Sequence, residues 1–186
     1  MIYLSKGLAL RHSGEILTVS HLGGEYELTG ARAEVWERGR RGSIDAMNTN
    51  QFTAVCELAE QGLIETSADA GHDSYYRLLT NCVICPVKKW DLTISWSPLE
   101  CTVWKWLTKA GLRLTIAELV FLIEQRISPA PNLLGDSNRQ ALTESIYTRE
   151  TIFDGILESR MEQSPARDKT VNAVLSLLRR KKLILV

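Results

Sequence analysis

The stretch FTAVCELAEQGLI, residues 52–64, recurs near the C-terminus as VNAVLSLLRRKKLI, residues 171–184, with one additional residue in the second copy. The aligned apolar positions are Phe52 and Val171, Ala54 and Ala173, Val55 and Val174, Leu58 and Leu177, and Leu63 and Leu183. An amphipathic helix that runs directly into a strand is typical of the third helix and wing of a winged helix. The repeat therefore predicts an α+β protein with two winged-helix-like units in tandem, the second mostly helical. A chance match between two amphipathic helices is the alternative.

The composition is that of an ordinary globular protein. The 186 residues are 45% hydrophobic, which allows two domains of about 90 residues each with its own core. The 22 basic and 22 acidic residues cancel, so no overall field draws the chain to nucleic acid or to an anionic membrane. No apolar stretch approaches the roughly 20 residues that span a bilayer, and no export signal opens the chain. We therefore expect a cytoplasmic protein without a membrane partner.

The first unit, residues 1–80, is expected to begin with a three-stranded antiparallel meander between residues 7 and 30, with turns at 13–14 and 23–24. Thr29 is expected to cap a helix that ends at Gly39, and Thr49 or Asn50 to cap a helix over 51–61. Residues 42–47 allow a short helix at best. Residues 63–66 and 74–79 are expected to pair as the two arms of a wing, joined by the polar turn 67–73.

Residues 81–97 are expected to connect the first unit to the second, residues 98–186. The second unit should contain a helix from Pro98 to Gly111, a helix over 116–127 capped by Thr115, helices over 138–147 and 149–161, a last helix from 164–165, and a terminal strand over 183–186. Four tryptophans cluster around the connection, and we expect them to hold the two units together; they are Trp90, Trp96, Trp104 and Trp106.

The order of elements in the first 80 residues resembles the PqqD-like family, the precursor-peptide recognition elements of ribosomally made, modified peptides. The matching stretches are EYELTGARA at 25–33, Val35-Trp36 and LAEQGLI at 58–64, so the resemblance rests on patterning and covers the first unit only. It implies that a leader peptide adds as a strand beside the third strand of the meander and packs against the third helix. Such β-augmentation uses main-chain bonds for affinity and side-chain pockets for selectivity.

Carried onto this chain, the resemblance implies a peptide-binding site made of a strand edge and a helical groove. The edge would be Glu25, Tyr26, Glu27 and Leu28, and the groove would be Phe52, Val55, Cys56 and Ala59. For each apolar residue taken singly, a place in the core is the alternative, and the two glutamates also suit a strand edge protected against aggregation. The expected function is a non-enzymatic adaptor that captures an extended segment, such as a precursor leader peptide, for a modifying enzyme.

A winged-helix transcription regulator is the alternative function. Basic clusters follow the first helix and the last helix; they are Arg38, Arg40 and Arg41, and Arg179, Arg180, Lys181 and Lys182. Cations at helix C-termini are favoured by the helix dipole, whereas DNA readers place contacts at the N-terminal end of the recognition helix. In the second unit that end offers the candidate DNA-binding residues Arg167, Lys169, Thr170 and Asn172.

The motif CVICP at 82–86 could supply half of a zinc site, with Cys101 or Cys56 as further ligands. There is no second CxxC, and His12, His21 and His72 lack ligand spacing, so reduced thiols that fill apolar space are the favoured interpretation. The sequence also lacks a glycine-rich phosphate loop, a nucleophile elbow and an HExxH pair. We therefore expect no metal, no cofactor and no enzymatic activity.

Overall fold

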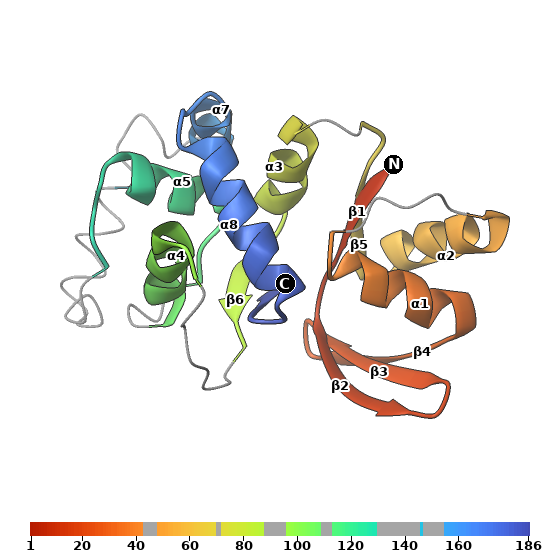
Figure 1. Cartoon of the computed structure of the whole chain (residues 1–186). Coiled ribbons are helices and arrows are strands. Elements are labelled where there is room, and N and C mark those ends of the chain that lie inside the picture. Colours follow the sequence, from red (N-terminus) through yellow and green to blue (C-terminus); the bar gives the residue numbers. More distant parts are fainter. Residues whose placement is uncertain (43–47, 70–71, 88–95, 109–112, 130–145, 147–154) are drawn as a thin grey trace.

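A computed structural model describes residues 1–42, 48–69, 72–87, 96–108, 113–129, 146 and 155–186 (Figure 1). The described chain is a mixed α and β structure with three small sheets. Figure 1 shows two groups of elements side by side, with the N-terminal strand and the C-terminus both near their junction. In chain order the elements are β1 Ile2–Ser5, β2 Leu8–Ser13, β3 Ile16–His21, β4 Gly24–Thr29, α1 Gly30–Gly39, α2 Thr49–Glu60, β5 Ile64–Ser67, α3 His72–Thr80, β6 Ile84–Pro86, α4 Pro98–Thr108, α5 Ile116–Glu124, α7 Ile156–Glu162, α8 Arg167–Arg179 and β7 Leu183–Leu185.

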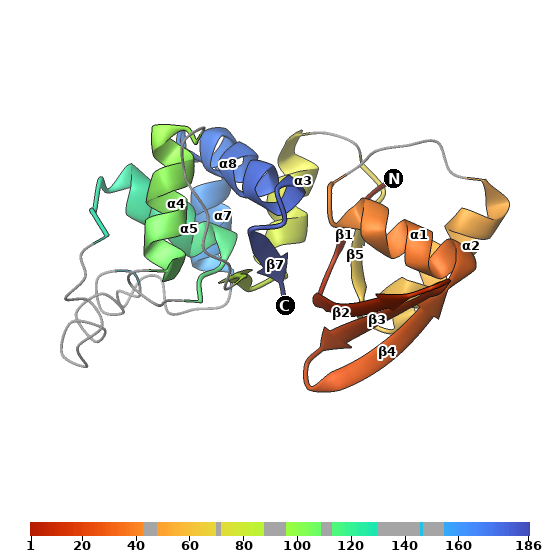
Figure 2. The ribbon, with the colours of Figure 1, turned by 60° about the horizontal axis from the view of Figure 1, so that its bottom comes forward.

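The predicted meander is confirmed as the antiparallel sheet β2-β3-β4. On its inner face Leu17 and Val19 of β3 lie opposite Leu28 and Tyr26 of β4, and the three aliphatic side chains are buried. They pack with Trp36 of α1 and with apolar side chains of α2 in one core. Figure 2 shows α1 and α2 on the same side of this sheet, with β4 as its outer strand.

The predicted wing is wrong. Strand β5 exists, but its partner is the N-terminal strand β1, with Ser5 opposite Ile64. Residues 74–79 lie in helix α3 because Tyr76 and Leu79 recur at helical spacing and are both buried against the second core. A strand there would have turned one of the two side chains into water.

Strand β1 joins two hydrophobic cores. Its alternating side chains face opposite ways, so Ile2 and Leu4 pack in the core of the second unit while Tyr3 packs in the core of the first. Residues of α3 and β6, predicted to belong to the first unit and the connection, also lie in the second core. The packing therefore changes from one core to the other between β5 and α3.

The second unit surrounds its core with α3, α4, α5, α7 and α8, and a short sheet closes one end. The terminal strand β7 pairs with β6, so the predicted C-terminal strand is confirmed and its partner comes from the segment expected to be the connection.

The tryptophans do not join the units as predicted. Trp106 is fully buried in the second core, and the Trp96 and Trp104 rings pack on that core in a T-shaped pair with centroids 5.4 Å apart. Trp90 lies outside the described residues.

The helix starts match the sequence predictions in part. Thr115 caps α5 as expected, and its hydroxyl accepts from the Glu118 amide at 3.3 Å. Asn48 rather than Thr49 or Asn50 caps α2, while Thr29 occupies the N-cap of α1 without a side-chain bond. The helices expected over 138–147 and 42–47 fall almost entirely outside the described residues. Of the helix expected over 149–161, the second half is confirmed as α7, and residues 149–154 lie outside the described residues. Within the described part of the chain, no helix has the length and apolarity needed to cross a membrane.

Candidate functional site

Strand β4 ends its sheet, which leaves one row of its main-chain groups without a strand partner among the described residues. The strand alternates between the two faces of the sheet, since Tyr26 and Leu28 point toward the core and Glu25 and Glu27 point into water. Tyr26 is only half-buried, whereas Leu28 is fully buried. The predicted edge residues therefore form an accessible strand edge in which Leu28 has a structural role.

Helix α2 carries the predicted groove residues, and the structure divides them. Val55 is 1% exposed and belongs to the core. Phe52, Cys56 and Ala59 lie along another side of the helix, where Phe52 is 52% exposed, Cys56 is exposed and Ala59 is half-buried. Their spacing of four and three residues places them in one row. Three of the four predicted side chains thus form an accessible apolar row.

The internal repeat shows that the exposure of Phe52 is unusual. At the other aligned positions both copies are buried, as for Leu58 and Leu177, which are each fully buried. Phe52 is the exception, because its counterpart Val171 is only 4% exposed. The first unit therefore leaves uncovered a large apolar side chain at a position that the second unit covers.

Polar contacts fix α2 relative to the start of α1, which directly follows β4. Arg32 in the first turn of α1 donates to the Gln61 side chain at 2.9 Å, and its Nε lies 3.8 Å from the Glu57 carboxylate. Nearer the start of α2, the Gln51 side chain donates to Glu34 of α1 at 3.4 Å. The strand edge and the apolar row are thus held by neighbouring elements of one unit. Arg32 was not singled out from the sequence, because only the packing of α1 on α2 reveals its role.

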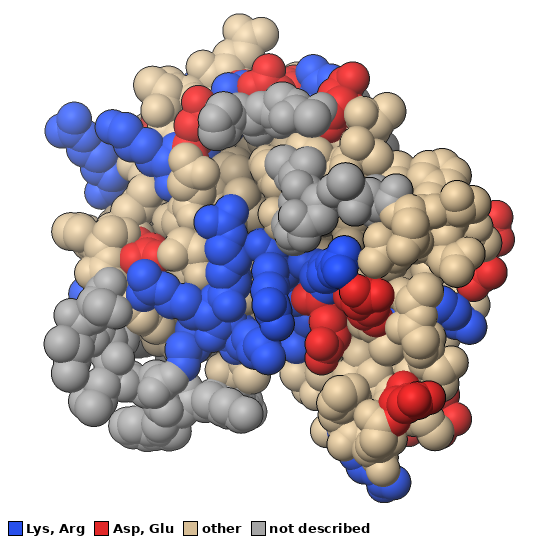
Figure 3. Space-filling view, turned by 45° about the vertical axis from the view of Figure 1, so that its right-hand side comes forward, with Lys and Arg blue, Asp and Glu red and all other residues tan. Residues whose placement is uncertain are grey.

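The charge around this site is acidic. Glu25 and Glu27 on the outer face of β4 and Glu57 and Glu60 on α2 are all exposed, and Arg32 is the only one of the described cations that forms an ion pair with any of them. Elsewhere, Figure 3 shows a group of Lys and Arg side chains next to a smaller acidic group on one face. A partner of the β4 site would therefore be favoured if its solvent-facing side chains were basic.

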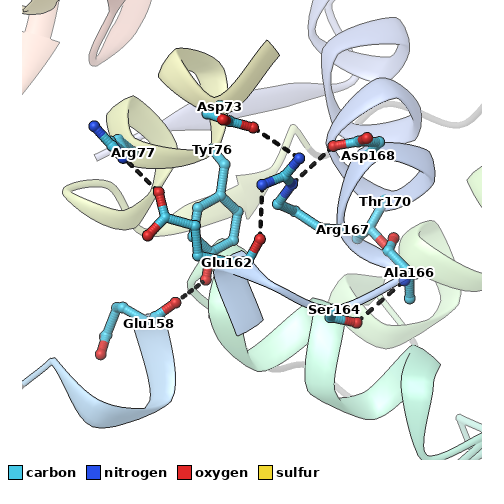
Figure 4. A network of polar contacts seen from close by, with 10 residues as sticks. All are labelled: Asp73, Tyr76, Arg77, Glu158, Glu162, Ser164, Ala166, Arg167, Asp168 and Thr170. Atoms are coloured by element: carbon cyan, nitrogen blue, oxygen red, sulfur yellow. Dashed lines mark hydrogen bonds and ion pairs between the residues drawn. The ribbon is translucent and has the colours of Figure 1, made fainter. Parts of the chain in front are cut away.

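The predicted DNA-binding residues at the start of α8 belong largely to an internal network (Figure 4). Arg167 lies 2.7 Å from the Asp73 carboxylate and 2.8 Å from that of Asp168, and it also donates to the Glu162 carbonyl at 2.7 Å. Thr170 is fully buried, and its hydroxyl donates to the Ala166 carbonyl at 2.8 Å. Lys169 and Asn172 are exposed. Arg167 therefore joins α8 to α3 and α7, and the Thr170 side chain is buried and bonded within its own helix.

The cysteines do not gather. Cys82 is buried, donates to the Leu78 carbonyl at 3.4 Å, and has its thiol pKa raised to about 12 by burial. Cys56 is exposed on α2, while Cys85 and Cys101 are half-buried. Among the described residues no three His, Cys, Asp or Glu side chains are placed to hold a metal ion.

No family model, curated protein or solved structure matches the chain.

Proposed function

We propose that this protein is a peptide-binding adaptor that captures an extended segment by strand addition to β4, in the manner of precursor-peptide recognition. The observation that carries the proposal is the open edge of β4 in the same unit as the exposed apolar row Phe52, Cys56 and Ala59. The row supplies what an edge strand alone lacks, which is a means of selecting side chains.

The geometry predicts the pattern of the bound peptide. An added strand would continue the alternation of β4, so every second side chain would point to the inner face, beside Tyr26 and the row on α2. The others would lie on the outer face beside Glu25 and Glu27. We therefore expect peptides in which apolar residues alternate with polar or basic ones.

Phe52 is expected to be the main apolar anchor. Covering the exposed half of a phenylalanine side chain removes about 100 Å² from water, which corresponds to about 2.5 kcal/mol at 25 cal/mol per Å². That contribution is large compared with single exposed ion pairs. About half of the Phe52 side chain is exposed and lies outside the core. Its truncation should therefore weaken binding without unfolding the unit.

The test begins with selection of a displayed random-peptide library on the intact protein, followed by calorimetric titration of one enriched peptide. Phe52→Ser should weaken its binding by about 2 kcal/mol, roughly thirtyfold. Ile156→Ser is the matched control, because Ile156 is an exposed apolar residue on α7 of the second unit. Failure to enrich any peptide, or an equal loss in both variants, would contradict the proposed site.

A DNA-binding regulator has weaker support. Arg167 and Thr170 are engaged within the second unit, so Lys169 and Asn172 alone of the four candidates are exposed for phosphates or bases. Retardation of mixed genomic fragments at low salt that disappears in Lys169→Ala would favour this alternative.

A further inference from the structure

The two basic stretches of the sequence meet at the junction of the units. Arg41 follows α1 and Arg179 ends α8, and the Arg179 Nε donates to the Arg41 carbonyl at 3.1 Å across 138 residues of sequence. Beside this contact is a hollow lined by Glu37, Arg40, Arg41, Leu178 and Lys181. Residues from both units therefore build one surface depression, which we name the junction hollow.

Four cations at the junction hollow lack an ion pair among the described residues. Neighbouring Arg38 pairs with Glu34, and Arg180 lies 3.7 Å from Glu100, whereas the ion pairs of the described chain do not include Arg40, Arg41, Arg179 or Lys181. The Arg40 guanidinium lies over the Trp36 ring, 5.3 Å from its centroid, and this cation–π contact holds the side chain. A cluster of cations with few ion-pair partners favours an anionic ligand.

We propose that the junction hollow is a second interaction surface, which binds an acidic segment of a polypeptide. Glu37 lines the hollow together with Arg40, Arg41 and Lys181. A nucleic-acid backbone carries a charge at every phosphate and would bring one of them against the Glu37 carboxylate. A polypeptide can place neutral or basic residues there, and its apolar side chains can contact Leu178.

This surface goes beyond the peptide site at β4 and is separate from it. Helix α1 has 10 residues, so its two ends lie about 15 Å apart at 1.5 Å per residue. Arg32, in contact with α2 and close to β4, is in the first turn, whereas Arg40 and Arg41 follow the last turn. The acidic β4 site and the basic junction hollow thus lie at opposite ends of one helix.

The experiment uses the full chain and, as the acidic probe, a fluorescein-labelled decapeptide in which Glu alternates with Gly, with anisotropy as the readout. We expect binding that weakens as salt rises, and a loss of about tenfold in Arg41→Glu and more in Arg41→Glu with Arg179→Glu. Arg41 is exposed, so the single variant keeps the test valid if the double variant is unstable. The matched control is Arg126→Glu with Arg160→Glu, which reverses two exposed cations, one just after α5 and one on α7.

Labelled decathymidylate in parallel distinguishes the polymers. Absence of binding of the acidic probe at low salt, an equal loss in the control variant, or tighter Arg41-dependent binding of decathymidylate would each overturn the proposal. Phe52→Ser should leave binding of the acidic probe unchanged, so the two sites can fail independently.

Discussion

At the scale of single residues, Glu100 shows how a buried carboxylate is held ionised. Its side chain accepts from the Ser97 amide at 2.6 Å, and Arg180 of the α8 end lies 3.7 Å away. Burial alone would raise its pKa, but hydrogen bonds from Ser176 and Ser97 and the charge of Arg180 together hold the pKa of this carboxyl below its ordinary value. Glu100 therefore links the start of α4 to the end of α8.

The lowered pKa makes a prediction about acid stability. A carboxyl whose pKa is lower in the folded than in the unfolded state stabilises the fold above its unfolded pKa, about 4.3 for glutamate, and this stabilisation disappears as pH falls through the folded pKa. Glu100→Gln should lower the free energy of unfolding at neutral pH, and the difference from the wild type should shrink on acidification. Urea unfolding of both proteins from neutral to acidic pH measures this difference in the free energy of unfolding. A difference that stays constant with pH would contradict this account.

Residue spacing predicted burial well at aligned positions of the repeat where both copies face a core. Leu58 and Leu177 follow helical periodicity and are fully buried, as the repeat indicates. The same spacing cannot distinguish Phe52 from Val171, because exposure depends on which other element covers the helix. The exposed row of the candidate site was consequently only partly predictable: Val55 was assigned to the groove and lies in the core.

At the scale of elements, α2, α5 and α8 end in the same way. Gly62, Arg126 and Lys181 adopt positive φ values of 72°, 54° and 56°. The next amide then bonds back into the helix, from Leu63 to Leu58 and from Lys182 to Leu177 at 2.9 Å each, and from Ile127 to Leu122 at 3.0 Å. This left-handed cap turns each helix sharply into the following segment.

Gly62→Ala should lower the free energy of unfolding by about 1 kcal/mol, since a Cβ is unfavourable in the left-handed region. No atom lies within 4 Å of the added Cβ, so the effect isolates the backbone conformation. Gly62→Asn should cost less, because asparagine tolerates this region. Urea denaturation of both variants is the measurement, and equal stability of Gly62→Ala and the wild type would refute the assignment.

The helix-to-strand transitions were predictable because helical periodicity stops directly before Leu-Ile in both copies. The strand partners were not, since Ile64 of β5 pairs with Ser5 of β1, 59 positions earlier, and β7 pairs with β6 across the whole second unit. Long-range pairing is decided by packing rather than by local pattern. Residues 74–79 show the same limit, because β propensity favoured a strand and burial in the second core selected a helix.

At the scale of the whole molecule, β1 makes the two units depend on each other. Leu4 is fully buried in the second core, and its neighbour Tyr3 is buried in the first. Gly7 also donates to the Leu185 carbonyl of β7 at 2.7 Å. Neither core is complete without the same four-residue strand, so we expect the units to unfold together.

Leu4→Ala should destabilise the protein by about 2–5 kcal/mol, as expected for a cavity in a core. Hydrogen exchange measured by mass spectrometry should then show faster global exchange in α1 and α2 as well as in α8, although Leu4 packs in the second core. Ala9 is half-buried against the first core, so Ala9→Gly is a control variant that leaves β1 unchanged. Unchanged exchange of α1 and α2 in Leu4→Ala would contradict the coupling.

Strand addition to β4 is the central claim, and the main-chain bonds of the captured peptide test it most directly. A peptide enriched on the protein can be made in two forms, each N-methylated at alternate residues, because only every second amide of an added strand faces β4. Calorimetric titration should show that one form binds with at least about tenfold lower affinity, since each lost main-chain bond costs about 1 kcal/mol, while the other form stays close to the parent peptide. Equal affinities of the two methylated forms would contradict strand addition at β4.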